Sequence, residues 1–217
     1  MYYSFVNKII ILFLLITSCA VPSFDKRADY INELNNNEFD EFVYQNSFII
    51  YSLKKINNED EVVVYIEGDG LSWIDRFTPS SDPTPKNPLA FKLAKLDQNQ
   101  NVVYLTRPCQ YIQNNRCQRE IWTKLQYSNE IMTNYTNILK ELKNKHSEVH
   151  LVGYSGGSVI AMYLASIKEL NIKSVRTVAG NIKPNEFTQL LNISPYRTSL
   201  NLNAIENNIQ FVSQSHF

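Results

Sequence analysis

The sequence predicts an α/β protein built on a mostly parallel sheet with helices on both faces. Short β-branched runs, such as residues 61–66 and 101–106, alternate along the chain with segments of helical periodicity. A continuous apolar run of this kind is typical of a strand covered on both faces. The six glycines all come just after a predicted strand. They therefore gather at the carboxyl edge of the sheet, where sheets of this class bind ligands.

The first half of the chain is expected to begin the sheet. Residues 21–37 are polar with apolar positions at helical spacing, which predicts a short helix or a tether. Residues 38–44 and 48–53 are apolar-rich and are separated by Gln-Asn-Ser, which predicts an antiparallel hairpin. The buried strand 61–66 leads into a long loop over residues 71–86. Loops of this length inside a compact domain are usually functional.

The second half alternates helices and strands. Asn87 and Pro88 predict a helix start, as N-cap and first helical residue. The expected elements are helix 89–96, strand 101–106, helix 121–143, strand 148–152, a helix to about residue 170, strand 174–179 and a last short strand 209–212.

A strand, a sharp turn and a helix are predicted over residues 149–165, with Ser155 at the apex. Residues 153–157 read Gly-Tyr-Ser-Gly-Gly, the Gly-x-Ser-x-Gly pattern of a nucleophile elbow. Glycine two positions before and after the serine suits a turn this tight, because a side chain would clash there. The Gly156 N–H would lie at a helix N-terminus, where an oxyanion is stabilised. We therefore expect Ser155 to be a nucleophile and Gly156 an oxyanion donor.

Length and charge set broad limits on function. A chain of 217 residues suits one domain with a substantial core. The 21 basic and 21 acidic residues balance, so nothing argues for nucleic acid as a partner.

Residues 1–18 are predicted to be a lipoprotein signal peptide. The apolar run over residues 9–16 is too short for a permanent membrane span, which needs about 20 residues. Residues 16–19 (Ile-Thr-Ser-Cys) resemble the bacterial lipobox, in which Cys19 receives a lipid and becomes the first residue. An ordinary secretory signal and an uncleaved anchor are the alternatives. Ala20 rather than Asp follows the cysteine, and the resemblance to bacterial lipoproteins then implies a lipid anchor in the outer rather than the inner membrane, with the protein facing the periplasm.

Cys109 and Cys117 are expected to form a disulfide. An exported chain meets an oxidising compartment, and these two cysteines remain if Cys19 is lipidated. Two free thiols or a metal site are the alternatives. No nearby histidine or second cysteine pair completes a zinc spacing, so we expect no metal, and no cofactor either.

Four motifs together resemble a group of α/β-hydrolase lipoproteins of Gram-negative bacteria, of serine esterase or lipase type. They are residues 66–70 (Ile-Glu-Gly-Asp-Gly), 82–85 (Asp-Pro-Thr-Pro), 104–111 (Tyr-Leu-Thr-Arg-Pro-Cys-Gln-Tyr) and 153–157. With the resemblance beginning near residue 48, the chain divides into the signal peptide, a tether and first strand over residues 19–47, and a hydrolase domain over 48–217.

The resemblance implies a role for each site residue. Ser155 would attack a small ester, and the backbone N–H groups of Gly156 and Asp69 would form the oxyanion hole. Glu67 and Asp69 depart from the expected pattern, because two carboxylates beside such a hole oppose catalysis unless they are turned away or paired. Arg107 also follows a strand, so we expect it to pair with one of them.

The sequence provides the least evidence for the acid and the histidine of a catalytic triad. A serine nucleophile needs a histidine base and an orienting acid, which follow it along the chain in this fold. The fold calls for two strands after 174–179, the acid following the first and the histidine the second, and the chain has room for one. We therefore favour a domain lacking its last strand or strands over His216 as a relocated base. Glu186 is the weak candidate for the acid.

Three functions fit these observations. The first is a serine hydrolase that acts through Ser155, or an inactive form of one that lacks the acid and the histidine of the triad. The second is a non-catalytic envelope lipoprotein that keeps the hydrolase fold as a binding or structural module. In the third, a separate polypeptide supplies the missing strand and histidine.

Overall fold

The computed structural model describes residues 22–217 except 181–182, 191, 193–194, 199–204 and 206. The expected signal peptide and Cys19 lie outside the described residues. Within the described ranges, no helix has both the length and the apolar character needed to cross a membrane.

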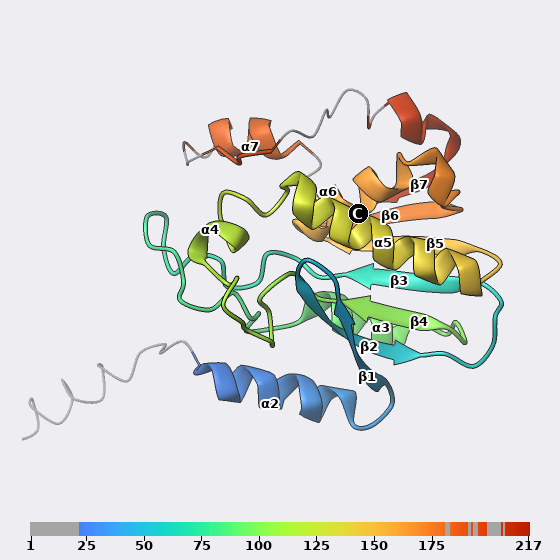
Figure 1. Ribbon diagram of the computed structural model, residues 1–217, viewed down its shortest axis with the longest axis horizontal. Helices are drawn as coiled ribbons and strands as arrows, with labels where there is room; N and C mark the ends of the chain where they lie inside the picture. The colour runs from blue at the N-terminus through green and yellow to red at the C-terminus, as the bar shows by residue number, and fades with distance from the viewer. Residues whose placement is uncertain (1–21, 181–182, 191, 193–194, 199–204, 206) are drawn as a thin grey trace, which may run out of the picture.

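Seven strands of the described chain form one sheet, in the order β1-β2-β4-β3-β5-β6-β7 (Figure 1). The strands are β1 (Asp40–Gln45), β2 (Ile49–Lys55), β3 (Val62–Ile66), β4 (Val102–Leu105), β5 (Val149–Tyr154), β6 (Ser174–Val178) and β7 (Ser213–His216). β1 and β2 form the expected antiparallel hairpin, and β2 also runs antiparallel to β4. The other pairs are all parallel, which confirms the mostly parallel sheet.

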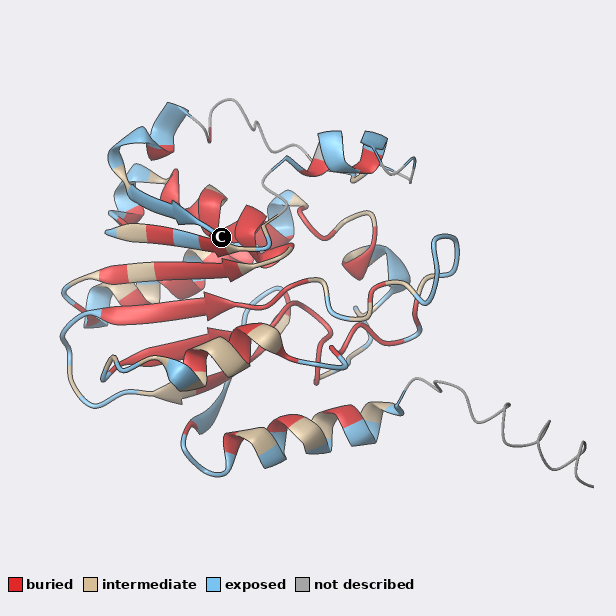
Figure 2. Cartoon of the chain, turned by 180° about the vertical axis from the view of Figure 1, so that it is seen from behind, coloured by how far each residue is buried: buried red, intermediate tan, exposed pale blue. Residues whose placement is uncertain are grey.

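Helices cover both faces of this sheet, as the sequence predicts. The helices α5 (Asn129–Lys145) and α6 (Gly157–Ala165) pack on one face, and α2 (Phe24–Asn35) and α3 (Leu89–Leu96) pack on the other. β3 shows why its sequence has no polar side: Val62, Val64 and Ile66 join the core under α5 and α6, while Val63 and Tyr65 join the opposite core. Figure 2 shows β3 buried along its length between these layers.

The prediction of one long helix over residues 121–143 is wrong in one respect, because the structure has two helices separated by a break. A short helix, α4 (Arg119–Trp122), is separated from α5 by a turn. In this turn the Leu125 N–H donates to the Glu120 carbonyl at 2.8 Å, and Arg107 Nη2 donates to the Gln126 carbonyl at 2.9 Å. Apolar spacing alone does not reveal the break, since Tyr127 inside the turn is also fully buried.

The C-terminal part also differs from expectation. Residues 209–212, expected as a strand, begin with a 3₁₀ helix, η2 (Ile209–Phe211), and the strand β7 follows instead. Every residue of β7 is exposed, so this edge strand has no apolar alternation for sequence reasoning to detect. The helix expected to reach residue 170 ends at Ala165, with a further 3₁₀ turn, η1 (Lys168–Leu170). A further helix, α7 (Pro184–Leu190), lies beyond β6.

Candidate active site

The elbow and the loop after β3 meet at the carboxyl edge of the sheet. The two strands that carry them are parallel neighbours, with Ile66 of β3 opposite Gly153 of β5. A methyl group built on Gly68 would lie 3.1 Å from Cβ of Ser155. The two loops that the sequence singles out for acyl transfer are therefore in direct contact.

Ser155 sits on a strained turn between β5 and α6. Its φ is +48°, in the left-handed region that a side chain disfavours. The turn is held from both sides, because the Ser155 N–H donates to the Val178 carbonyl at 2.9 Å and the Ser155 carbonyl accepts from the Ser158 N–H at 3.0 Å. Gly157 must lack a side chain, since a Cβ there would overlap the Ile66 carbonyl. The expected strand, turn and helix are all present.

Asp69 is paired rather than left as a free negative charge at the site. Its Oδ1 lies 3.0 Å from Nη1 of Arg107, whose side chain is only 4% exposed. Nη2 of Arg107 donates to the backbone carbonyl and the side-chain oxygen of Gln126, at 2.9 and 3.3 Å. The Asp69 carboxylate also occupies the space that a Cβ on Gly156 would need. This ion pair is one of the two expected, and it joins the loop after β3 to the loop after β4, with the Asp69 carboxylate against Gly156 of the elbow.

The Glu67 carboxylate is buried and hydrogen-bonded at the start of α3, and Glu67 also lines a small cavity that reaches Ser155. Its carboxylate accepts the Gly68 N–H at 2.9 Å and the Tyr104 hydroxyl at 3.0 Å, and it also accepts the backbone N–H groups of Ala90 and Phe91. Burial raises the pKa of Glu67 to about 7. The expected N-cap role of Asn87 is wrong, because Pro88 occupies the N-cap without a side-chain bond and Glu67 supplies the acceptor instead.

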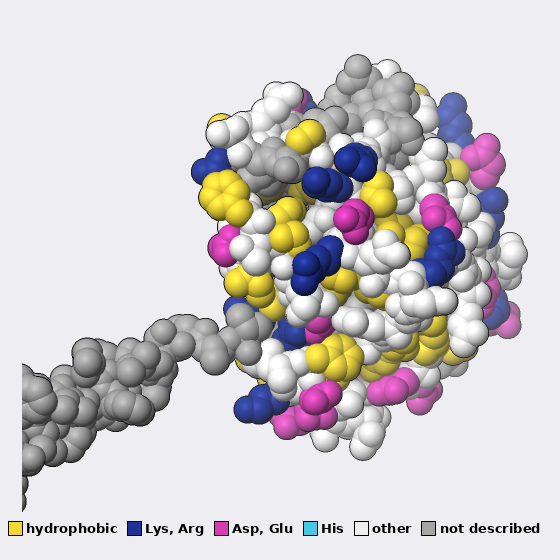
Figure 3. All heavy atoms as spheres, turned by 60° about the vertical axis from the view of Figure 1, so that its left-hand side comes forward, with side chains coloured by type: hydrophobic (Ala, Val, Ile, Leu, Met, Phe, Trp, Pro, Cys, Tyr) yellow, Lys and Arg dark blue, Asp and Glu magenta, His cyan; other side chains and the backbone are white. Residues whose placement is uncertain are grey.

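Two cavities open at Ser155. The larger, of about 690 Å³, is lined by Asp69, Ser155, Ala179, Gly180 and residues of α7 that include Glu186. The smaller, of about 320 Å³, lies between the β3 loop and the start of α3, and includes Tyr154. Figure 3 views the molecule from the side toward which β3 and β4 point in Figure 1, and it shows hydrophobic and charged side chains scattered among other residues on this face. No histidine is seen on it among the residues shown in colour.

The histidines are all placed elsewhere in the described structure. Nδ1 of His216 lies 2.8 Å from Oγ1 of Thr177, on a strand separated from β5 by β6. Nδ1 of His146 lies 3.1 Å from the Asp60 carbonyl, and His150 lies near the start of β5. None of the three lines either cavity with Ser155. The structure therefore brings Ser155, Gly156 and Asp69 together, but not His216.

Cys109 and Cys117 form the expected disulfide, with their Cα atoms 5.6 Å apart. The loop it closes carries Gln110, whose amide joins the ends of two strands. Its Nε2 donates to the Gly68 carbonyl at 3.1 Å, and its Oε1 accepts the Arg107 N–H at 3.0 Å. Sequence reasoning assigned no role to Gln110, although the residue lies inside the motif 104–111 that carries the resemblance.

Comparisons with known proteins agree with this architecture at the level of the fold. No protein-family model matches the sequence, and no curated protein matches it. Solved structures do match, among them an esterase from Pyrococcus furiosus with a TM-score of 0.54 and 11% identity, over 82% of this chain and 69% of that one. The chain has the α/β-hydrolase fold.

Two further matches are more distant. A naproxen esterase from Bacillus subtilis shows 12% identity and a TM-score of 0.44, over 75% of this chain and 52% of its own. An epoxide hydrolase from Vigna radiata shows 13% identity and a TM-score of 0.41, over 65% and 38%. The chain spans about half the length of several structures that it matches. At such identities the likeness shows the fold alone, and the function must be argued from the site.

Proposed function

We propose that this α/β-hydrolase chain is an acyl-transfer hydrolase of esterase or lipase type, in which Ser155 attacks a small ester. One observation carries the proposal. Ser155 is held at a positive φ between β5 and α6, at the wall of a cavity of about 690 Å³. Strain of this kind persists only where surrounding contacts enforce it, and it presents the hydroxyl to the cavity rather than to the core.

The chemistry follows from the groups around Ser155. Its Oγ would bond to the ester carbonyl carbon, and the carbonyl oxygen would become an oxyanion facing the backbone N–H groups of Gly156 and Asp69. Neither of these N–H groups donates to an acceptor within the described part of the chain. The tetrahedral intermediate would expel the alcohol and leave an acyl group on Ser155. Water would then release the acid and restore the hydroxyl.

The step that the site supports least is proton transfer. The Ser155 proton has to leave as Oγ attacks, and the departing alkoxide has to gain one. No histidine of the described chain lines the cavities at Ser155, so no described imidazole is placed to accept or donate either proton. We therefore propose that the isolated chain has a formed nucleophile position and oxyanion site but reacts slowly, because Ser155 is not deprotonated efficiently.

Added imidazole provides the test, since the larger cavity is open beside Ser155. We expect imidazole to accelerate hydrolysis of a p-nitrophenyl ester at least 10-fold more for the wild-type chain than for Ser155→Ala, measured by release of nitrophenolate. Without imidazole the two rates should differ by only a few fold, because removing a nucleophile costs little once its base is absent. The Ser155→Ala chain also corrects for the direct reaction of imidazole with the ester.

The lack of a histidine beside Ser155 among the described residues favours a second candidate function. A non-catalytic module would keep the cavity to bind a ligand, with the elbow as inherited architecture. Equal imidazole-dependent rates for the wild-type chain and Ser155→Ala would contradict the hydrolase proposal and favour this module.

Localisation is a proposal of its own, supported by residues 16–19 rather than by the fold. We propose that Cys19 carries a lipid that anchors the domain to a bacterial envelope membrane, facing the periplasm. Cells fed radiolabelled palmitate should label the wild-type chain but not Cys19→Ser. Equal labelling of the two chains would contradict the lipid anchor.

A further inference from the structure

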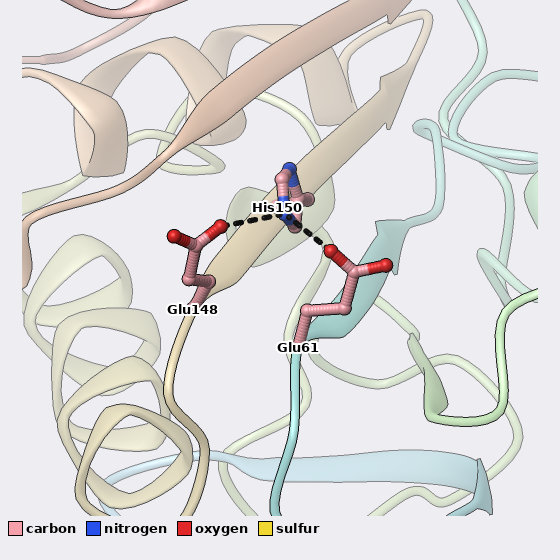
Figure 4. A group of neighbouring side chains, drawn as sticks. All are labelled: Glu61, Glu148 and His150. Atoms are coloured by element: carbon pink, nitrogen blue, oxygen red, sulfur yellow. Dashed lines mark ion pairs between the residues drawn. The ribbon is translucent and has the colours of Figure 1, made fainter.

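A second cluster of chemically active side chains lies at the opposite end of the sheet from Ser155. Glu61 comes just before β3, Glu148 just before β5, and His150 is the second residue of β5. Because Val62 pairs with Val149 and Val63 with His150, the starts of these two strands lie side by side. Figure 4 shows both carboxylates pointing toward the imidazole ring from the two neighbouring strands.

Three atoms in this cluster face a common point. Nε2 of His150 lies 3.5 Å from Oε2 of Glu61 and 3.8 Å from Oε2 of Glu148. One ligand atom from each side chain lies within 4.8 Å of the other two. Nε2 is shielded from solvent and has no hydrogen-bond partner among the described residues. This enclosed nitrogen lacks a partner, and a single ion could bind it together with the two nearby carboxylate oxygens.

The rest of each side chain is held by a separate neighbour. Nδ1 of His150 lies 2.7 Å from Oγ of Ser174, Oε1 of Glu61 accepts from Asn99 Nδ2 at 2.6 Å, and Oε1 of Glu148 lies 2.9 Å from Nζ of Lys173. With the His150 proton on Nδ1 and donated to Ser174, Nε2 presents its lone pair to the common point. Outer contacts of this type orient the ligands of metal sites in proteins.

We propose that Glu61, Glu148 and His150 bind a divalent transition-metal ion, for which Zn²⁺ is the best chemical fit. One imidazole and two carboxylates form a ligand set that zinc accepts, with water in the fourth position. Ligand atoms at about 2.1 Å from a tetrahedral ion lie about 3.4 Å apart. The distances between the three ligand atoms in the structure therefore need to shorten by about 1.5 Å at most. The side chains of Glu61 and Glu148 are 51% and 41% exposed, which leaves them room to make this adjustment.

The proposed ion would have a structural role. It would join the starts of β3 and β5, the two strands whose other ends carry Asp69 and Ser155. The site is independent of the proposed hydrolase activity. Sequence reasoning overlooked it because the expectation of no metal rested on the cysteines, while Glu61 is far from Glu148 and His150 along the chain.

The test uses the 217-residue chain in mild detergent, treated with a chelator and then titrated with ZnCl₂. We expect saturating zinc to raise the thermal midpoint by about 5–10 °C at a hundredfold excess over Kd. In ¹⁵N spectra of the imidazole rings, Nε2 of His150 should shift on zinc addition, while His146 and His216 should not. Glu61→Gln and Glu148→Gln should each weaken zinc binding at least 10-fold.

Glu141→Gln provides the matched control. Glu141 is 42% exposed and pairs with Lys145, much as Glu148 pairs with Lys173, but it lies on α5 outside the cluster. This variant should bind zinc as the wild-type chain does. The proposal is overturned if millimolar zinc leaves the His150 resonances unchanged. It is also overturned if the two cluster variants keep wild-type affinity, because zinc would then be bound elsewhere.

Discussion

Arg107→Met is expected to destabilise the fold by about 3 kcal/mol, which lowers the thermal midpoint by about 6–12 °C. The substitution keeps most of the apolar volume but removes the partner of the Asp69 carboxylate and the donor to the Gln126 carbonyl. Breaking a buried pair from one side is costly, because the other charge remains without compensation. Asp69 is 28% exposed, so water relieves part of this cost and the lower end of the usual range applies.

Arg116→Met is the matched control for this prediction. Arg116 pairs with Glu130 at 2.6 Å, but both side chains are nearly half exposed, so its loss should cost less than about 1 kcal/mol. Asp69→Asn added to Arg107→Met should recover part of the lost stability, because it removes the unpaired charge. Equal destabilisation by the two arginine variants in urea unfolding would show that the Arg107–Asp69 pair stabilises the fold no more than an exposed pair does.

Glu67 is expected to make the protein more stable at pH 5 than at pH 8. The folded chain keeps the proton of this buried carboxyl up to about pH 7, whereas the unfolded chain releases it near the ordinary glutamate pKa of 4.5. The folded state therefore binds more protons between these values, and stability falls as pH rises through that window. The full contribution is present below about pH 4.5, is lost by about pH 7, and amounts to about 3 kcal/mol.

Glu67→Gln separates this effect from the titration of other groups. The amide keeps an oxygen for the N–H groups of Ala90 and Phe91 but carries no titrating proton. Free energies of unfolding from urea titrations should fall between pH 5 and pH 8 by about 3 kcal/mol more for the wild-type chain than for the variant. An equal decrease in both would mean that Glu67 does not titrate in this window.

Much of the fold could be predicted because its signals are local. The β-branched run before Ile66 and the glycines around Ser155 each report a nearby physical requirement, either burial on both faces or a crowded turn. The elements that sequence reasoning missed depend on distant groups. The break between α4 and α5 is held by Arg107, and the cap of α3 comes from Glu67, which precedes the helix by a long loop.

The residues of the site show the same difference between local sequence signals and distant contacts. The strand, turn and helix of the elbow are encoded within a few residues, so the position of Ser155 on a tight turn can be predicted from the sequence. The pairing of Asp69 with Arg107 could be expected because the carboxyl ends of neighbouring parallel strands meet at one edge. Gln110 and the cluster around His150 could not be expected, because their roles arise from contacts that no spacing pattern records.

The central claim is that Ser155 is a nucleophile position facing a substrate cavity, and a covalent adduct tests it most directly. The wild-type chain and Ser155→Ala would be incubated with a fluorophosphonate and imidazole, then digested, and the phosphonylated peptides identified by mass spectrometry. We expect the phosphonyl group on Ser155 of the wild-type chain and no adduct at that peptide in Ser155→Ala. An unlabelled Ser155, or equal labelling of both chains at another residue, would contradict the claim.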